Sequence, residues 1–320
     1  MDALADLLDG VRARGSLFSQ TVLRPPWALR FANPTLLTVA TMVRGHGWVI
    51  TDEGAPLPLK AGDIAIVRGH GAHSVADHPD TPAQYVVQGA DLCTTPDGTP
   101  LLDELTLGPR LCGDSPDGPD LLLSGSYELG GEISQRLLSA LPRAFVVSNA
   151  EYRCPAMDLV AQESTKEQPG QQVVLDRLLD LVLISTLRYW FDRPDTRTPS
   201  WYSAMADPVV GRALRLMHEA PARPWTIASL AQGCGVSRAS LARRFTALVG
   251  EPPMTYLTEW RITRAAEHLR NGRATVEAIA QRVGYANAFA LSVAFKRLRG
   301  VTPTEYRKAL KDSPGRGQLS

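Results

Sequence analysis

The chain has 320 residues, of which 44% are hydrophobic and 21% are charged. This length exceeds what one core ordinarily organises, so we expect a globular protein of two domains. Charges interrupt every run of about 18 residues, the length that crosses a bilayer, and Met1 to Gly10 carries three aspartates where a signal peptide carries positive charge. We therefore expect a cytoplasmic protein with no membrane contact.

The four cysteines, Cys93, Cys112, Cys154 and Cys234, lie far apart and form no C-x-x-C pair. This spacing disfavours a disulfide framework and a thiolate zinc site. We expect most of them to be small apolar packing residues.

Residues 20–147 are rich in glycine, proline and short apolar runs, such as Leu36 to Val43 and Ile64 to Val67. Turn residues separate these runs at close spacing, which is typical of strands joined by short loops. The pattern predicts a β-sandwich or a barrel.

From Gln171 to Phe191 apolar residues recur at helical spacing, which predicts one long helix with a broad apolar face. This helix either packs on its own β domain or also pairs with a second copy of itself. Two prolines and polar neighbours follow, and they disfavour regular helix. We therefore place the first domain at residues 1–191 and an interdomain linker at residues 192–206.

The charge is distributed unevenly along the chain. From Asp207 to Ser320 there are 18 Lys and Arg against 8 Asp and Glu, which leaves 16 against 25 for residues 1–206. The net charge of +1 therefore divides into +10 and −9. A basic domain is expected where a protein binds the phosphates of nucleic acid, although many basic surfaces simply face water.

The basic part is helical in pattern and contains a two-copy repeat. Five corresponding pairs are 49 residues apart: Thr226/Thr275, Leu230/Ile279, Ala231/Ala280, Gln232/Gln281 and Gly235/Gly284. Five further pairs are 50 apart: Leu241/Leu291, Phe245/Phe295, Gly250/Gly300, Pro253/Pro303 and Tyr256/Tyr306. Each copy therefore predicts a helix, a tight turn and a second helix, with one extra residue in the second turn.

The residue types suit this arrangement. Gly235 and Gly284 supply the left-handed backbone that the turns require, and Ser237 is placed to cap the helix that follows. Leucine and phenylalanine four residues apart anchor each second helix in the core, which leaves the opposite face for DNA. We place the two units at about residues 226–247 and 275–298.

Between the copies, Met254 to Arg270 predicts one helix of roughly 17 residues, or about 25 Å. A rod of this length sets two recognition helices roughly one DNA turn apart, about 34 Å, on one side of the duplex. Helical pairs also occur in bundles that never touch DNA, but two copies, a spacer helix and the charge together favour DNA binding.

On these residues, segment 207–311 resembles the DNA-binding domain of the AraC/XylS family of transcription regulators. The resemblance rests on Leu230-Ala231, Ser237-Arg238, Arg243-Arg244-Phe245, Trp260-Arg261, Ile279-Ala280, Val283-Gly284-Tyr285, Ala294-Phe295-Lys296-Arg297 and the stretch from Gly300 to Arg307. It implies two helix-turn-helix units that enter successive major-groove segments of double-stranded promoter DNA.

The resemblance also implies which side chains meet DNA. The residues implied to bind DNA are Ser237, Arg238, Ser240, Arg243, Arg244, Asn287, Phe289, Lys296 and Arg297. The positions implied to face the bases also include Ala239, Ala242, Ala288, Ala290 and Val293. Arg243 is the first candidate for a base contact, because a guanidinium donates two hydrogen bonds to guanine.

The second unit departs from its family, which usually carries Glu at the position of Ala288 and Arg at that of Val293. It can still meet thymine methyl groups through Ala290 or Val293, while Lys296, Arg297 and Arg299 hold phosphates. We therefore expect specificity to be concentrated in the first unit.

Residues 20–150 resemble the cupin-like sensory domain of one branch of this family. The resemblance rests on Leu59 to Ile64, Arg68 to His73, Leu111 to Gly113 and Leu137 to Pro142. It implies a domain that receives a signal, although cupin barrels also serve as enzymes.

Three kinds of signal are open. His46, His70, His73 and His78 suggest a metal, but the H-x-H-x-E cluster of metal-binding cupins is missing, so we expect no bound metal and no cofactor. Cysteine oxidation at Cys93 or Cys112 requires an exposed and partly ionised thiol. A small organic effector requires a pocket, for which the aromatic candidates are Trp27, Phe31, Trp48 and Tyr85.

Together these features predict a multidomain α+β protein: a β-rich cupin-like barrel with a helical dimerisation segment, an all-α double helix-turn-helix domain and a flexible tail at residues 312–320. We expect a homodimeric transcription regulator, more commonly an activator that contacts RNA polymerase, with no catalytic residues. The residues that we expect to bind an effector or to sense the signal are His70, His73, Trp48, Cys93 and Cys112. The alternative is a cupin enzyme or metal-binding protein that carries a DNA-binding domain.

Overall fold

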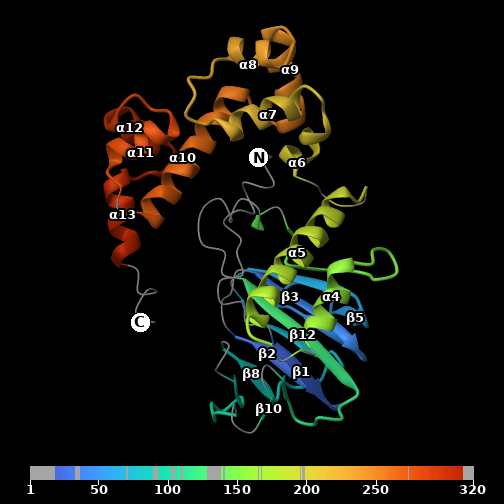
Figure 1. The fold of residues 1–320 in the computed structure, drawn as a ribbon. Coiled ribbons are helices and arrows are strands. Elements are labelled where there is room, and N and C mark those ends of the chain that lie inside the picture. Colours follow the sequence, from blue (N-terminus) through green and yellow to red (C-terminus); the bar gives the residue numbers. More distant parts are fainter. Residues whose placement is uncertain are drawn as a thin grey trace. The chain divides into compact units, whose positions relative to one another are not determined.

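A computed structural model describes residues 19–32, 37–69, 71–88, 93–101, 105–108, 111–127, 138–139, 141–164, 166, 168–194, 196, 199–272 and 274–312 (Figure 1). These residues form two compact units, one β-rich and ending at residue 196, the other helical and beginning at residue 199. His70, the first 18 residues of the predicted first domain and residues 313–320 of the predicted tail lie outside the described residues.

The β-rich unit contains two sheets. The seven-stranded sheet has the order β10-β11-β1-β12-β3-β6-β13 and consists of β1 (Ser19–Leu23), β3 (Leu37–Arg44), β6 (Ile64–Arg68), β10 (Thr106–Gly108), β11 (Leu111–Gly113), β12 (Asp120–Tyr127) and β13 (Ala144–Val147). The six-stranded sheet has the order β5-β4-β7-β2-β8-β9 and consists of β2 (Ala28–Phe31), β4 (His46–Ile50), β5 (Leu57–Lys60), β7 (His73–Ala76), β8 (Tyr85–Val87) and β9 (Cys93–Thr94).

One apolar core is shared by the two sheets. Met42 and Leu122 of the seven-stranded sheet belong to the same buried cluster as Leu29, Val49 and Val75 of the six-stranded sheet. Side chains alternate between the two faces of a strand, and β4 shows this alternation between buried and less buried residues. The predicted β-rich domain is confirmed, and its two sheets enclose a common interior.

Helices α4 (Pro155–Ser164) and α5 (Gln171–Asp192) cover the outer face of the seven-stranded sheet (Figure 1). The ring of Trp190 stacks on Phe145 of β13 at a centroid distance of 4.0 Å, and Leu179 lies against Gly125 of β12. The predicted long helix therefore packs on its own β domain. No helix among the described residues is long and apolar enough to cross a membrane.

The second unit is helical throughout, as its pattern predicted. It consists of α6 (Ser200–Ser203), the short 3-10 helix η1 (Ala204–Ala206), α7 (Val210–Glu219), α8 (Ile227–Gly233), α9 (Arg238–Val249), α10 (Pro253–Asn271), α11 (Val276–Val283), α12 (Ala288–Arg299) and α13 (Pro303–Asp312).

Helix α10 contributes to two apolar cores. Near its beginning, Tyr256 accepts or donates a hydrogen bond with the ring of His218 of α7 at 2.8 Å, and it meets Phe245 of α9 edge to face. Its later residues, including Ile262 and Leu269, belong to a separate buried cluster with α11 and α12. The spacer helix is thus a structural part of both helix-turn-helix units.

The predicted linker at residues 192–206 extends less far than expected. Residues 200–206 form α6 and η1, in which Trp201 and Ala204 are buried, and the Ser200 hydroxyl donates a hydrogen bond to the carbonyl of Val249 at 2.9 Å. Proline and charge mark the start of the linker, but the apolar Trp201 anchors its end to the helical unit.

Candidate nucleic-acid interface

The first helix-turn-helix is α8, a tight turn and α9, and each helix begins at a capping side chain. Thr226 and Ser229 exchange side-chain to backbone hydrogen bonds at the start of α8. The Ser237 hydroxyl accepts the N–H of Ser240 at 3.2 Å, which fixes the start of α9. Gly235 in the turn has φ +70°, as predicted.

Helix α9 carries its apolar residues on one face and its arginines on the other. Leu241 and Phe245 are fully buried, whereas Arg238 and Arg243 are exposed. Within the described part of the chain, no ion pair or hydrogen bond engages the guanidinium of Arg238 or Arg243. Both predicted contacts are therefore available to a ligand.

Arg244 is engaged with the protein itself. Its Nη2 lies 2.6 Å from Oδ2 of Asp207, and its Nε donates to the same oxygen at 2.8 Å. The Asp207 carboxylate also accepts the backbone N–H groups of Val209 and Val210, both at 2.9 Å, at the start of α7. Arg244 thus stabilises the junction of α7 and α9, a role that its predicted place in the DNA-binding set did not include.

The second helix-turn-helix is α11, a turn at Gly284 and α12. The Asn287 side-chain oxygen accepts the N–H of Ala290 at 2.9 Å, so Asn287 caps α12 as Ser237 caps α9. Glu277 of α11 accepts the N–H of Ala288 at 2.8 Å and satisfies a further donor of the same helix start. The side-chain oxygen of Asn287 is therefore already engaged in the fold, and its amide hydrogens are the groups it has left to offer DNA.

The outward face of α12 is apolar at its start and basic at its end. Phe289 is 77% exposed and Val293 is 55% exposed, and Lys296 and Arg297 are exposed beyond them. Arg299 is less available than predicted, because its Nη2 donates to Thr263 of α10 at 3.2 Å. The structure thus brings together exposed apolar and basic side chains, whereas Leu291 and Phe295 are fully buried, as predicted.

Sequence reasoning missed Asp207 and Glu277, which hold the starts of α7 and α12. An acidic residue just before a helix is a recognisable capping signal, and Asp207 fits it. Glu277 gave no such signal, because it lies eleven residues before the backbone group that it satisfies.

Among the predicted sensing residues of the β-rich unit, His73 is the most deeply placed. It is 5% exposed, and its ring stacks on Phe31 at a centroid distance of 4.9 Å. Burial, with a contribution from the charge of Arg143, lowers the pKa of His73 to about 4. The imidazole is therefore neutral at pH 7, and its Nε2 has no hydrogen-bond partner among the residues that the structure describes.

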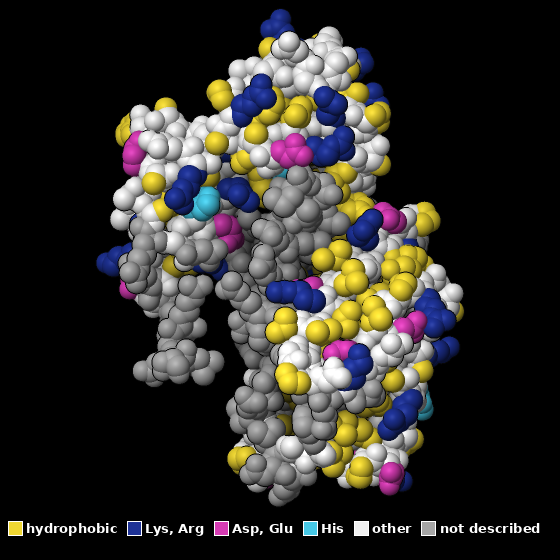
Figure 2. Space-filling model, in the orientation of Figure 1, with side chains coloured by type: hydrophobic (Ala, Val, Ile, Leu, Met, Phe, Trp, Pro, Cys, Tyr) yellow, Lys and Arg dark blue, Asp and Glu magenta, His cyan; other side chains and the backbone are white. Residues whose placement is uncertain are grey.

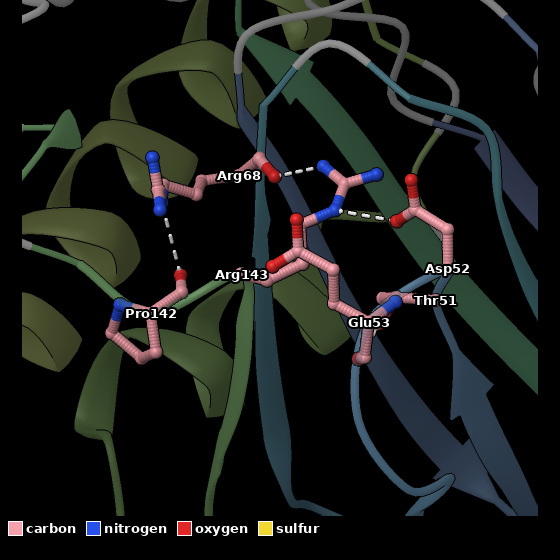
Figure 3. A network of polar contacts seen from close by, with 6 residues as sticks. All are labelled: Thr51, Asp52, Glu53, Arg68, Pro142 and Arg143. Atoms are coloured by element: carbon pink, nitrogen blue, oxygen red, sulfur yellow. Dashed lines mark hydrogen bonds and ion pairs between the residues drawn. The ribbon is translucent and has the colours of Figure 1, made fainter.

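Arg143 ties three segments of the β-rich unit together (Figure 3). Its Nε donates to Asp52, which follows β4, at 3.0 Å, and its Nη1 donates to the carbonyl of Arg68 at the end of β6. Arg68 in turn donates to the carbonyl of Pro142 at 3.3 Å. Asp52 and Arg143 thus form an ion pair that joins these segments.

The environments of the thiols and the aromatic rings give little support to cysteine oxidation or to a small organic effector as the signal. Burial raises the pKa of Cys93 and of Cys112, so neither is a pre-ionised thiolate. Trp27 is fully buried and donates to Asp120 at 2.8 Å, and Phe31 belongs to the same core. These two rings are core residues, while Trp48 is half-buried on β4.

No group of three His, Cys, Asp or Glu side chains among the described residues is arranged to hold a metal ion. His46 is exposed on β4, and the exposed His78 lies 3.7 Å from Asp80. Neither shares a site with the buried His73.

Comparison with known proteins matches both units. The family model described as "Cupin" matches residues 2–192, and that described as "Helix-turn-helix domain" matches residues 230–309. A "Putative AraC-like transcription regulator" of Streptomyces lividans is 34% identical over 96% of this chain and 98% of its own length. The "HTH-type transcriptional regulator AlkR" of Acinetobacter baylyi is 27% identical over 96% of this chain and 99% of its own length.

Among solved structures, the DNA-binding domain of AdpA, the global transcriptional factor, in complex with a target DNA is 28% identical, with a TM-score of 0.33. The match covers 35% of this chain and 99% of that one.

Proposed function

Because this chain belongs to the family of AraC-like transcription regulators, we propose that it controls promoters by inserting α9 and α12 into successive major-groove segments. The chain is a DNA-binding transcription regulator; the contacts, partners and signal described below are the proposal. The observation that carries it is the outward face of α9, where Arg238 and Arg243 are exposed and have no ion pair or hydrogen bond with any residue that the structure describes.

The first unit reads bases through Arg243. This residue is exposed on α9 opposite the buried Leu241 and Phe245, and its guanidinium has the geometry to donate two hydrogen bonds to O6 and N7 of guanine. Arg238 is the first residue of α9. It is therefore placed to contact a phosphate or the base next to the one that Arg243 reads. Arg244, paired with Asp207, keeps α9 in place against α7.

The second unit reads bases through apolar contact. Phe289 and Val293 stand exposed on α12, and the family usually has Arg at the position of Val293. An apolar side chain in the major groove recognises the methyl group of thymine. Lys296 and Arg297 follow on the same helix and supply the positive charge that phosphates require. We therefore expect a thymine-containing second half-site.

A second copy of the chain pairs through α4 and α5. Val173, Val174 and Leu181 of α5 and Leu159 of α4 are exposed, at fractions of 44% to 62%. In Figure 2 hydrophobic side chains gather over this part of the β-rich unit. Val174 and Leu181 are seven residues apart and so lie on one helix face, which suits a pairing of identical helices.

The β-rich unit receives the signal to which the regulator responds, and it has no catalytic role. The relatives matched over nearly their whole length are named as transcription regulators, which does not favour the cupin enzyme that the sequence left as an alternative. An activator with this architecture contacts RNA polymerase in the cytoplasm. Iron, zinc and copper at stoichiometric amounts in the purified protein would instead favour a metal-dependent role.

A binding experiment tests the proposal directly. The purified chain is titrated against the DNA upstream of its own gene and against random DNA of equal length, over a series of salt concentrations. A regulator prefers its own DNA and shows a steep decrease in affinity with salt. Equal binding to both DNAs at every salt concentration would contradict the proposal.

A further inference from the structure

The two turn glycines of the repeat occupy different surroundings, although they correspond in sequence. Gly235 has φ +70°, and a Cβ added there would meet no atom of the described residues within 4 Å. Gly284 has φ +84°, and a Cβ added there would lie 2.8 Å from both the Cα and the carbonyl oxygen of Ala222. The turn of the second unit therefore packs directly on the segment that precedes α8 of the first unit.

Arg261 of α10 joins the same two segments. Its Nε donates to the carbonyl of Pro221 at 2.8 Å, and its Nη2 donates to the carbonyl of Arg223 at 2.7 Å. Its guanidinium also lies over the ring of Tyr285, the residue directly after Gly284, with the Cζ atom 6.0 Å from the ring centroid. One half-buried side chain thus contacts both helix-turn-helix units.

The position of Arg261 along α10 matches this role. The ring of Trp260, the preceding residue, packs against that of His218 of α7 in a tilted arrangement, at a centroid distance of 4.2 Å. Ile262, the following residue, is fully buried in the cluster formed with α11 and α12. Arg261 therefore stands where α10 passes from the first core to the second.

We propose that Arg261, with the contact of Gly284 on Ala222, is a positioning clamp that fixes the orientation of one helix-turn-helix unit relative to the other, and so the spacing of the two DNA half-sites. A single helix sets the distance between its ends, but helices curve gently along their length, so a second contact is needed to fix one orientation of the two units. The carbonyl contacts and the packed turn add a second connection beside α10. Attachment at two points holds the two units more rigidly than attachment through α10 alone.

Fixed orientation has a measurable consequence for DNA binding. When one unit is bound, the other meets its half-site at an effective concentration that depends on how well the linkage holds it in place. A loosened linkage lowers that concentration and tolerates more spacings. This consequence rests on the proposed function, because it requires both units to bind DNA.

The test begins with a DNA duplex that the wild-type chain selects from a random library. Derivatives have one half-site scrambled, or one or two base pairs inserted or deleted between the halves. We expect Arg261→Ala to lower affinity for the two-site duplex at least about tenfold, with affinity for a single half-site changed by less than about twofold. The variant should also lose the preference of the wild type for one spacing.

Two controls separate positioning from charge and from folding. Arg264→Ala removes a guanidinium from the same helix. That guanidinium lies over the ring of Trp260 and donates to no carbonyl in the described part of the chain, so this variant should keep the spacing preference. Gly284→Ala and Gly235→Ala impose the same left-handed strain, but only the first pushes on Ala222. We expect the spacing preference to be lost in Gly284→Ala and kept in Gly235→Ala.

The outcomes are distinct. Retention of the spacing preference in both Arg261→Ala and Gly284→Ala, or an equal loss on one-site and two-site duplexes, would overturn the clamp and leave the proposed function standing. A wild-type chain that selects no sequence would overturn the proposed function and, with it, the clamp's effect on DNA. Circular dichroism confirms that each variant is folded before binding is measured.

Discussion

The carboxylate of Asp207 accepts two hydrogen bonds from Arg244, 37 residues later in the chain, and holds the first N–H groups of α7 with its other oxygen. The Asp207 side chain is 14% exposed and that of Arg244 is 45% exposed. The carboxylate therefore matters more to the fold as a helix cap than as half of an ion pair.

Asp207→Ala should lower the free energy of unfolding of the helical unit by about 1–2 kcal/mol, since it removes a cap and a charged acceptor. Arg244→Ala should cost about 0–1 kcal/mol, because its ion pair is partly exposed. Urea denaturation followed by circular dichroism measures both. The prediction is wrong if Arg244→Ala is the more destabilising of the two.

The contacts of Asp207 also predict that the stability of the helical unit depends on pH. Burial alone would raise the pKa of Asp207, but the hydrogen bonds from Val210, Arg244 and Val209 outweigh it and hold the pKa below its usual value. A carboxyl with a depressed pKa stabilises the fold above its unfolded pKa and loses this contribution as pH falls through the folded pKa. The stability difference between wild type and Asp207→Asn should therefore shrink below about pH 4.

Arg243→Ala should reduce the preference for promoter over random DNA by about 1–3 kcal/mol, the value of one bidentate contact with guanine. Lys296→Ala is the matched control, because loss of a phosphate contact weakens binding to all sequences alike and lowers the salt dependence. Fluorescence anisotropy with promoter DNA and with random DNA gives, for each variant, the ratio of the two affinities. An unchanged ratio for Arg243→Ala would show that Arg243 does not read bases.

Replacement of thymine by deoxyuridine in the second half-site tests Phe289 and Val293. Each lost methyl contact should cost about 0.8 kcal/mol, or roughly fourfold in affinity. Phe289→Ala should bind more weakly than wild type and should discriminate less between thymine and uracil. Equal sensitivity of wild type and variant to the replacement would place Phe289 away from the methyl groups.

His73 predicts a loss of stability in mild acid. Its folded pKa of about 4 lies below the ordinary value of 6.5, so the unfolded chain binds the proton more readily. Stability is complete above about pH 6.5 and decreases towards pH 4, by roughly 3 kcal/mol in total. In His73→Phe, which preserves stacking on Phe31, this decrease should be smaller. Hydrogen exchange at β2 and β7 reports it separately from the helical unit.

Leu181→Glu should shift the chain towards monomer in sedimentation, because it places a charge in the proposed helix pairing. Leu248→Glu is the control, since Leu248 is another exposed leucine, on α9 of the helical unit. A wild-type chain that is monomeric at micromolar concentration with and without DNA would refute the pairing.

The sequence by itself determined the features that depend on local spacing. Period and repeat placed α8 to α12 within a few residues, Gly235 and Ser237 predicted the turn and the cap, and the four-residue spacing of Leu241 and Phe245 identified the buried face. Such features are visible in sequence because helix and turn conformations are set by residues that are near neighbours in the chain.

The tertiary structure decided which distant residues meet. It paired Arg244 with Asp207, buried His73 against Phe31, and placed Arg261 on the carbonyls of Pro221 and Arg223, about 40 residues upstream. It also anchored Trp201 to the helical unit and so shortened the predicted linker. The spacing of residues within one segment does not indicate which residue of a distant segment each side chain will contact, because those contacts depend on the packing of the whole unit.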